Sequence, residues 1–541
     1  TKLWLLLQAF TAKHCLALNS SVENKLVSNG SFLTKTIRKR ILIENKCLKY
    51  AANFTQLGED IEGRTKFDQI GNSVSLSSDG TTIAVGVQRR RGVNPKLGHV
   101  RVYRYDLTTQ SWSQLGEDIN GDSGDDSPFI VSISGNGNVI AYGAVNGFRS
   151  QRGHVRVFFL DESTGTWVQI GEDIQGEMNK DRLGAYVSLS SDGESLAVGI
   201  PFIDDEGITN RGGVRIYRVL PGVLAPHGSI ILGETGNEFA GSTVSIAPHG
   251  LGMVAIGYPG YSSNGLNNRG RVRIFLFSLI KFDWVQHGST IFGEAGDDRL
   301  GRVSLSTDGT TVAIGTPSHR NNRGLVRVYR FSNKLNDWEQ MGQGIHGFNN
   351  GDNFGLSISI STDGMAVAIG ASNSDQNGIS SGHVALYNFD NIKNKWVQVG
   401  PDINGEAPGD KAGLAVSLSS NGRVIATGTY LNDGNGMEDS GHVRVFTFEH
   451  IFQCKDNSQK DNFFCRCRCD ENYISYETGN KYLAGDDDFC VTMPSSMPSK
   501  SPSVSFRPSI SPSLLPSISP SYAPSTSPSL SPSTIPTYAP S

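Results

Sequence analysis

A phrase of about 57 residues recurs seven times in this chain, and this period limits the folds that the chain can adopt. The motif VSLSSDG and its variants place a glycine at seven positions, which are Gly80, Gly137, Gly193, Gly250, Gly309, Gly364 and Gly422. A second motif, GHVRVY and its variants, also occurs seven times. Two motifs that share one period indicate seven copies of one structural unit.

Each unit contains four strand-like segments. In the first unit, residues 72–78 alternate apolar and polar side chains, as a half-buried strand does, and Ser-Asp-Gly at 78–80 suits a hairpin turn. Residues 81–87 are nearly all apolar, as in a strand that is covered on both faces. The third and fourth segments lie at 99–106 and 111–119. Seven units of four antiparallel strands predict an all-β fold, the seven-bladed β-propeller.

The second strand of every unit carries Ala and Gly two positions apart, as at Ala84 and Gly86. Because glycine weakens a strand, its recurrence predicts close backbone approach between neighbouring sheets. Residues 54–61 have the sequence of a fourth strand with no first three before it, whereas the last unit lacks its fourth. We therefore predict that the segment around Phe54 completes the seventh blade and closes the ring.

The unit at 354–372 resembles the FG-GAP repeats that build the seven-bladed propeller heads of integrin α-subunits. Phe354 and Gly355 match the FG, and the GTP at 315–317 of the preceding unit stands for the GAP. The resemblance covers roughly residues 54–449. It implies a propeller and, in units that carry calcium, an Asp-x-Asp-x-Asp-Gly loop.

The calcium loops of that family are not matched in this sequence. The corresponding positions hold SSDG, STDG, SGNG or SSNG, with one carboxylate at most. One carboxylate cannot supply the six to eight oxygen ligands that Ca²⁺ prefers. We therefore predict no metal site of this kind and no cofactor.

A longer stretch, WVQIGEDIQGE at 167–177, resembles a group of secreted repeat proteins of bacteria and micro-algae, whose algal members carry Ser/Pro-rich tails. This resemblance implies extracellular or cell-surface life and no particular activity.

The segments outside the repeats also predict a secreted protein. An apolar run with small residues near Ala17 reads as a signal peptide, and proline recurs about every four residues near the C-terminus, as in an extended stalk. No other stretch is long and apolar enough to predict a membrane span. The predicted segments are a signal peptide at 1–17, an N-terminal extension at 18–52, the propeller at 53–450, a Cys-rich disulfide module at 451–493 and a Pro/Ser-rich low-complexity stalk at 494–541.

The chain has seven cysteines, and removal of a signal peptide through Ala17 leaves six. In an oxidising compartment these predict up to three disulfides, formed among Cys47, Cys454, Cys465, Cys467, Cys469 and Cys490. Zinc binding by the closely spaced cysteines is the alternative. Sequons predict N-glycosylation at Asn19, Asn29 and Asn53.

Two sets of loops on one face of the predicted ring differ in charge. The inter-blade loops, which lead into each first strand, are acidic, as at 116–126, 293–298 and 405–410. The loops between the second and third strands are basic in the first five units and neutral or acidic in the last two. We predict that the basic set binds a sulfated or carboxylated glycan; the alternative is intramolecular pairing with the acidic loops. The candidate ligand-binding residues are Arg89, Arg90, Arg91, Arg149, Arg152, Arg211, Arg269, Arg320 and Arg323.

Charged residues that recur once in each unit are expected to serve the blade itself. These include His99 and its equivalents, Arg101 and its equivalents, and an acidic residue three positions before the first-strand glycine. For the acidic set we favour an Asp–Arg contact within or between blades; it contains Asp68, Asp181, Glu238, Asp298, Asp352 and Asp410.

Charge and motifs together predict a protein that is not an enzyme. A net charge of −4 argues against a general nucleic-acid binder. The sequence shows no nucleophile elbow, phosphate-binding loop or His-Glu-x-x-His motif, and no carboxylate pair stands out from the repeats, so we assign no catalytic residue.

We predict an extracellular adhesion or recognition protein at the cell surface or in the cell wall. It is expected to be a monomeric ring that binds a glycan or protein ligand on its loop face and is tethered by the stalk. The alternatives are a structural component of the wall or matrix without a dedicated ligand, and a carbohydrate-active propeller enzyme.

Overall fold

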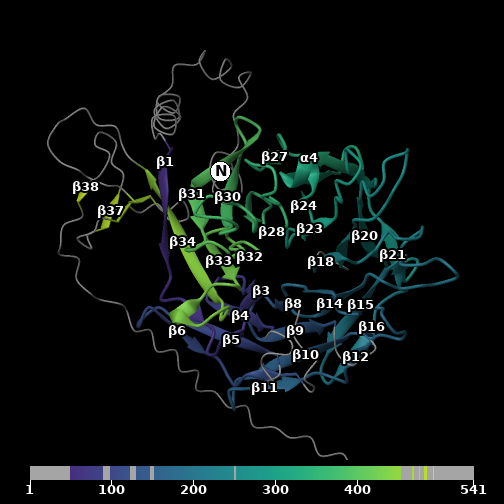
Figure 1. The fold of residues 1–541 in the computed structure, drawn as a ribbon, viewed down its shortest axis with the longest axis horizontal. Coiled ribbons are helices and arrows are strands. Elements are labelled where there is room, and N and C mark those ends of the chain that lie inside the picture. Colours follow the sequence, from purple (N-terminus) through teal and green to yellow (C-terminus); the bar gives the residue numbers. More distant parts are fainter. Residues whose placement is uncertain are drawn as a thin grey trace, which may run out of the picture.

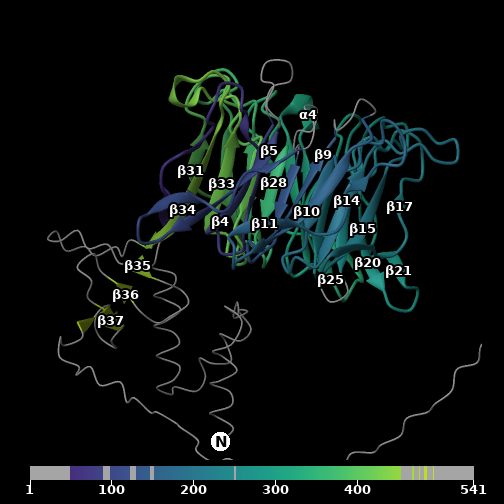
Figure 2. The same cartoon turned by 90° about the horizontal axis from the view of Figure 1, so that it is seen from below.

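The computed structural model describes residues 49–88, 98–121, 130–145, 151–248 and 252–452, together with four short strands between 466 and 492. Residues 49–452 form seven antiparallel sheets arranged radially about a central axis (Figure 1). The predicted all-β, seven-bladed propeller is therefore confirmed. In the view from below, the blades stand side by side with their strands running between the two faces of the ring (Figure 2). No helix in the described ranges is long and apolar enough to cross a membrane.

Each blade places its strands from the axis outward in a fixed order. The innermost strands are β3 (Ile70–Leu76), β8 (Ile130–Ile133), β13 (Tyr186–Leu189), β18 (Thr243–Ala247), β23 (Arg302–Leu305), β28 (Ser357–Ile360) and β32 (Ala415–Leu418). The second strands are β4 (Thr82–Val87), β9 (Val139–Ala144), β14 (Ser195–Ile200), β19 (Met253–Tyr258), β24 (Thr311–Thr316), β29 (Ala366–Ala371) and β33 (Val424–Thr429). The third strands are β5 (His99–Asp106), β10 (His154–Asp161), β15 (Gly213–Leu220), β20 (Arg271–Ser278), β25 (Leu325–Ser332), β30 (His383–Asp390) and β34 (His442–Phe452). The outermost strands are β6 (Ser111–Gln114), β11 (Thr166–Gln169), β16 (Val223–Pro226), β21 (Asp283–Gln286), β26 (Asp337–Gln340), β31 (Lys395–Asn404) and β1 (Lys49–Gln56).

The fourth segment of the first blade is split where the sequence predicted one strand over 111–119. β6 ends at Gln114, and Gly116 has a left-handed φ of 73°, which glycine adopts without a Cβ clash. The chain then pairs a second time with the third strand through a short strand of two residues. These short strands are β2 (Ile61–Glu62), β7 (Ile119–Asn120), β12 (Ile174–Gln175), β17 (Ile231–Leu232), β22 (Ile291–Phe292) and β27 (Ile345–His346), whereas β31 of blade 6 runs through both pairings.

The N-terminal strand β1 closes the ring, as the sequence predicted. It pairs antiparallel with β34, with Phe54 opposite Phe448, and the two rings meet edge-on at a centroid distance of 5.9 Å. Trp112 of blade 1 donates its indole N–H to the Leu57 carbonyl at 2.7 Å. Trp167 makes the same bond to Leu115 of blade 1 at 2.9 Å, so β1 stands where an outermost strand stands in the other blades.

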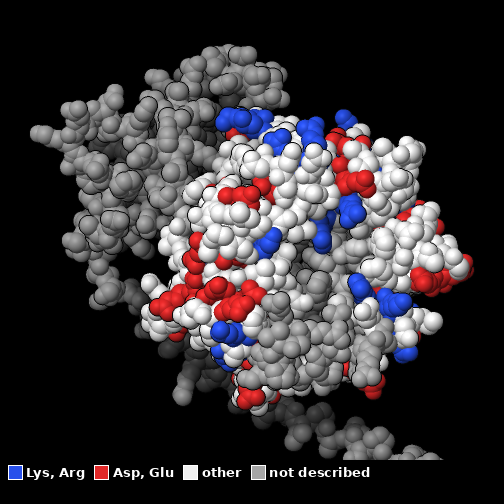
Figure 3. Space-filling model, in the orientation of Figure 1, with Lys and Arg blue, Asp and Glu red and all other residues white. Residues whose placement is uncertain are grey.

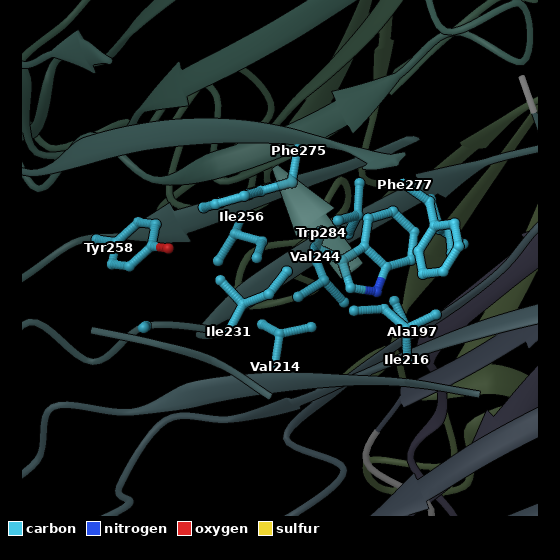
Figure 4. Packing of buried hydrophobic residues seen from close by; sticks show 13 residues of the cluster. Ala197, Val214, Ile216, Ile231, Val244, Ile256, Tyr258, Phe275, Phe277 and Trp284 are labelled. Atoms are coloured by element: carbon cyan, nitrogen blue, oxygen red, sulfur yellow. The ribbon is translucent and has the colours of Figure 1, made fainter. Parts of the chain in front are cut away.

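The hydrophobic core lies between neighbouring blades (Figure 4). In the cluster shown there, Ala197 and Val214 come from blade 3, and Ile256, Phe275 and Trp284 come from blade 4. All six residues of the second strand β19 are buried, as its continuous apolar sequence predicted. Each blade therefore depends on its neighbours to cover both of its faces.

Glycines of the second strands make that packing close. A Cβ atom placed on Gly257 would lie 1.9 Å from the carbonyl oxygen of Gly301 in the next blade. The approach between blades predicted from the Ala/Gly pattern is confirmed. The same contact recurs between Gly143 and Gly184, Gly199 and Gly241, Gly315 and Gly355, Gly370 and Gly413, and Gly428 and Gly71.

A ring of serine hydroxyl groups joins the innermost strands. Each hydroxyl accepts the backbone N–H of a residue in the following blade, at donor–acceptor distances of 2.9 to 3.2 Å. The last bond, from Leu76 to Ser417, joins blade 1 to blade 7 and completes the circle. The seven serines are Ser75, Ser132, Ser188, Ser245, Ser304, Ser359 and Ser417.

Four further strands form a small antiparallel sheet of their own. They are β35 (Arg466–Cys467), β36 (Ile474–Ser475), β37 (Lys481–Leu483) and β38 (Val491–Thr492).

Candidate functional site

Three arginines of the predicted glycan-binding set are held by the backbone of the ring. Arg211, Arg269 and Arg323 each donate Nε–H to the carbonyl oxygen of the glycine that begins the next inter-blade loop, at 2.9, 3.0 and 2.6 Å. Arg211 is also paired with Asp205 at 2.7 Å, and Arg269 lies over the ring of Phe292 at 5.1 Å. These contacts fix the loops of blades 3, 4 and 5 in place.

The other arginines of this set are placed differently. Arg152 is exposed and donates to the side chain of Asn179 at 3.0 Å. Arg320 is exposed within α4 (His319–Asn322), a short helix in the loop between β24 and β25. Arg89, Arg90, Arg91 and Arg149 lie outside the described residues. So do the side chains of Asn19, Asn29 and Asn53 and of the cysteines predicted to form disulfides.

The recurring acidic residues of the inter-blade loops are buried beneath their own turns. Glu238 accepts a bond from Arg271 at 2.8 Å, so the expected contact with arginine is present there. Asp298 and Asp410 each accept two backbone N–H groups of their own loop, as Glu238 also does. Asp298 also binds Nδ1 of His319 at 2.9 Å. These carboxylates therefore organise their own loops through nearby backbone donors.

The aspartate of the SSDG motif serves a hairpin turn. Asp79 accepts hydrogen bonds from the Ser77 hydroxyl at 2.6 Å, from the Thr81 N–H at 2.9 Å and from the Thr81 hydroxyl at 2.8 Å. Burial alone would raise the pKa of Asp79, but these hydrogen bonds together lower it below its ordinary value. Both carboxylate oxygens are thus used within the turn.

Arginines of the third strands pair with acidic groups on the loop face. Arg101 in β5 is 1% exposed and binds Asp118 through Nε at 3.1 Å. Arg156 in β10 binds Asp173 in the equivalent place, through two bonds of 2.8 Å. Burial would raise the pKa of Asp118, but the Arg101 guanidinium, with help from neighbouring groups, lowers it below its ordinary value.

The substitution Asp118→Asn is expected to lower the free energy of unfolding at pH 7 by about 2 kcal/mol, because it leaves the buried Arg101 without its counter-charge. The pKa of Asp118 is lower in the folded than in the unfolded protein. The carboxylate therefore contributes its full stabilisation above the pKa of the unfolded state, about 3.9, and this stabilisation is lost as the pH falls through the pKa of the folded state. Urea unfolding of both proteins from pH 7 down to pH 3 measures the difference. A difference in the free energy of unfolding between the two proteins that stays constant from pH 7 to pH 3 would contradict this role for the carboxylate.

One group of charged residues lies where the ring closes, and one of its members departs from the repeat pattern. We call Asp60, Glu62, Glu406 and His442 the seam cluster, because they lie where β1 and β2 meet β34. One potential ligand atom from each of Asp60, Glu406 and His442 lies within 4.8 Å of the other two. Nδ1 of His442 is 3.5 Å from Oδ2 of Asp60, and the His442 side chain is 1% exposed.

Burial and neighbouring charges shift the pKa values of two residues in the seam cluster. Burial raises the pKa of Glu62, and the charges of Asp60 and Glu406 raise it further. Burial lowers the pKa of His442 although Asp60 opposes this, so the imidazole is held toward its neutral form. Nε2 of His442 and Oε2 of Glu62 are buried and have no hydrogen-bond partner among the described residues.

Glu62 is the residue that breaks the repeat. At the same position of the short strand the other blades carry uncharged or imidazole side chains, namely Asn120, Gln175, Leu232, Phe292, His346 and Asn404. Sequence reasoning missed this site because it treated 54–61 only as a closing strand. A comparison of the repeats position by position would have marked Glu62.

The face of blade 7 is also the acidic side of the ring. Acidic side chains gather there in Figure 3, over the part of the ring where Figure 1 places β33 and β34. Among the described residues, Glu406, Asp433 and Glu438 are exposed and belong to the loops of this blade. We call these three residues the acidic sector.

A cavity of about 160 Å³ lies at the axis of the ring, where the innermost strands meet the SSDG turns. Its lining includes Ser188, Ser245, Ser304 and Ser359 of the serine ring. Because these hydroxyl groups already accept backbone N–H groups, the cavity wall is part of the structure that holds the blades together.

Neither a scan against protein-family models nor a search of curated proteins gives a match to this chain. The structure confirms the seven-bladed fold that the FG-GAP resemblance implies, and membership of that family stays a prediction.

Solved structures with a similar fold include a putative 6-phosphogluconolactonase from Bacteroides uniformis, with 13% identity and a TM-score of 0.45 over 62% of this chain and 86% of that one. The periplasmic gluconolactonase PpgL of Pseudomonas aeruginosa has 15% identity and a TM-score of 0.42 over 62% and 85% of the two chains. The C-terminal WD40 domain of Sif2 has 12% identity and a TM-score of 0.43 over 74% and 99%. Similarities of this size assign neither a family nor an activity.

Proposed function

We propose that this propeller is a non-enzymatic extracellular recognition protein that binds a positively charged protein ligand on the acidic sector of blade 7. The observation that carries the proposal is the unequal use of charge around the loop face. Arg211, Arg269 and Arg323 are tied to the ring itself. Among the described residues of the predicted set, Arg152 and Arg320 are exposed but lie on blades 2 and 5, whereas the carboxylates of Asp433 and Glu438 are exposed together on blade 7. A ligand that approaches blade 7 therefore meets exposed negative charge.

The chemistry of the acidic sector suits a surface rich in Lys and Arg. Complementary charge speeds the encounter of two proteins and fixes their orientation. The extracellular setting of this proposal rests on the apolar N-terminal segment and the Pro/Ser-rich segment, which would tether the ring to a cell surface or wall.

The proposal is tested by measuring the binding of the full chain to two probes, a Lys/Arg-rich peptide of about 20 residues and a sulfated glycan such as heparin. The double variant Asp433→Asn with Glu438→Gln removes charge from the acidic sector. Asp433 now accepts the Asp439 N–H at 2.9 Å, and the amide oxygen that replaces its carboxylate can accept the same bond, so the loop is expected to keep its shape. Peptide binding should weaken about fivefold in low salt.

The matched control is the double variant Arg152→Gln with Arg320→Gln, which removes two exposed charges from the same face. We expect it to bind the peptide like the parent protein. Glycan binding that disappears in this control would overturn the proposal in favour of the basic loops. Binding of neither probe would favour a structural component, and release of reducing sugar from a glycan panel would favour the carbohydrate-active alternative.

A further inference from the structure

We propose that the seam cluster holds one divalent transition-metal ion, which fastens the N-terminal strand of the ring to its last blade. The ligands are Asp60, Glu406 and His442, whose ligand atoms lie within 4.8 Å of one another. One imidazole nitrogen and two carboxylates suit Zn²⁺ or Mn²⁺ better than Mg²⁺ or Ca²⁺, which prefer oxygen ligands alone.

The ligand atoms must move closer together to reach bonding distance. Bonds of about 2.0–2.2 Å from Zn²⁺ to nitrogen or oxygen, at tetrahedral angles, place two ligand atoms about 3.4 Å apart, so atoms that now lie within 4.8 Å of one another must approach by about 1 Å. Glu406 is exposed, so its side chain can make this adjustment. Its Oε1 is now paired with Nη1 of Arg444 at 3.2 Å, so the ion would use the other carboxylate oxygen or compete with that arginine.

His442 is placed to supply the nitrogen ligand. Its side chain is 1% exposed, and Nδ1, the ring nitrogen that faces Asp60 at 3.5 Å, is the atom that can bind the ion. A neutral imidazole is the form that binds metals. Glu62 lies two residues after Asp60 and places a further carboxyl group beside the site, whose buried Oε2 has no hydrogen-bond partner among the described residues.

The position of the cluster gives the ion a structural role. Asp60 lies between β1 and β2 at the start of the ring, His442 begins β34 at its end, and Glu406 lies in the loop before β32. An ion bound to all three therefore crosslinks the two ends of the propeller. This inference goes beyond the recognition proposal, because the ion fastens the ring whether or not a partner binds.

The test is the thermal unfolding of the full chain after removal of metal with EDTA and dialysis, followed by addition of Zn²⁺, Mn²⁺ or Mg²⁺. At a concentration of about 100 times Kd, Zn²⁺ or Mn²⁺ should raise the Tm by about 2 °C or more, and Mg²⁺ should not. His442→Gln and Asp60→Asn should abolish this rise. Glu62→Gln should weaken the apparent metal affinity about threefold, because it removes a neighbouring charge.

His383→Gln is the matched control. His383 begins β30 of blade 6 as His442 begins β34, and both side chains are buried. This variant should keep the full Zn²⁺ response. The cysteines after the ring are the same in every protein, so zinc bound to them cannot produce a difference between the variants.

A Tm rise of equal size in the parent, His442→Gln and Asp60→Asn proteins would overturn the proposal, as would the lack of any response to Zn²⁺ and Mn²⁺. If His442→Gln fails to fold, Asp60→Asn and Glu62→Gln decide the matter by isothermal titration. The peptide-binding experiment is run without added metal, so failure of the recognition proposal and failure of the metal site are read separately.

Discussion

Replacing Gly257 by alanine is expected to lower the free energy of unfolding by about 3 kcal/mol and the Tm by roughly 5 °C. The new Cβ atom would lie 1.9 Å from the Gly301 carbonyl oxygen and 2.6 Å from the Thr243 hydroxyl oxygen. No L-residue tolerates contacts this short, and the obstacle at Gly301 is backbone rather than a flexible side chain. Blades 4 and 5 would therefore have to separate, which would loosen the apolar core that both share.

Gly296→Ala is the matched control for this variant. Its Cβ atom would meet nothing closer than the Asn267 carbonyl oxygen at 3.4 Å, and its φ is not in the left-handed region. We expect a change within about 0.5 kcal/mol, with a small gain because alanine restricts the unfolded chain. Calorimetry or urea unfolding of the three proteins gives the comparison. Equal free energies of unfolding for Gly257→Ala and Gly296→Ala would show that the close approach between blades does not contribute to stability.

The second large effect is expected for Thr55→Pro in the closing strand. Thr55 stands opposite Thr447 in β34, and Leu57, two residues later, donates its N–H to Val445 at 2.8 Å. Because bonded pairs alternate along an antiparallel ladder, the Thr55 N–H also points to β34. Proline has no N–H, so the Thr447 carbonyl would lose its partner and β1 would be held less firmly. We expect a loss of about 2–3 kcal/mol.

Thr55→Val is the control, since valine keeps the N–H and favours strands. Limited proteolysis adds a local measurement. In the proline variant, cleavage near β1 should become faster while the strands of blades 3 to 5 stay protected. Uniform protection in both variants would contradict the view that β1 is what closes the ring.

The ring could be predicted from the sequence because the same sequence pattern occurs in each of the seven blades. Seven glycine-ended turns and seven Ala/Gly pairs indicated the same unit, and the isolated fourth strand around Phe54 could have only one place in a closed circle. Each of these patterns is local to about ten residues. Burial of the second strands and the close glycine contacts followed from the same short patterns.

The candidate site could not be predicted in the same way, because its members are distant in the chain. Asp60 and His442 meet only after the ring closes, and Glu406 joins them from the loop that leads from blade 6 into blade 7. The arginines show the opposite error. A loop rich in Arg indicated an anion site, but the partner of Arg269 is the Gly293 carbonyl oxygen, and a backbone acceptor leaves no mark in the sequence.

The closing strand has a consequence for how the protein is made. Phe54 and its partner Phe448 are separated by 394 positions, which is 448 minus 54. Translation therefore delivers the outermost strand of the last blade before the other six blades, and the three inner strands of that blade only after them. A nascent chain carries an unpaired β edge until synthesis passes Phe448, and premature termination before that point yields a product with two open sheet edges that can pair with other chains. The nascent propeller is therefore most open to pairing with other chains in the interval before β1 and β34 have met.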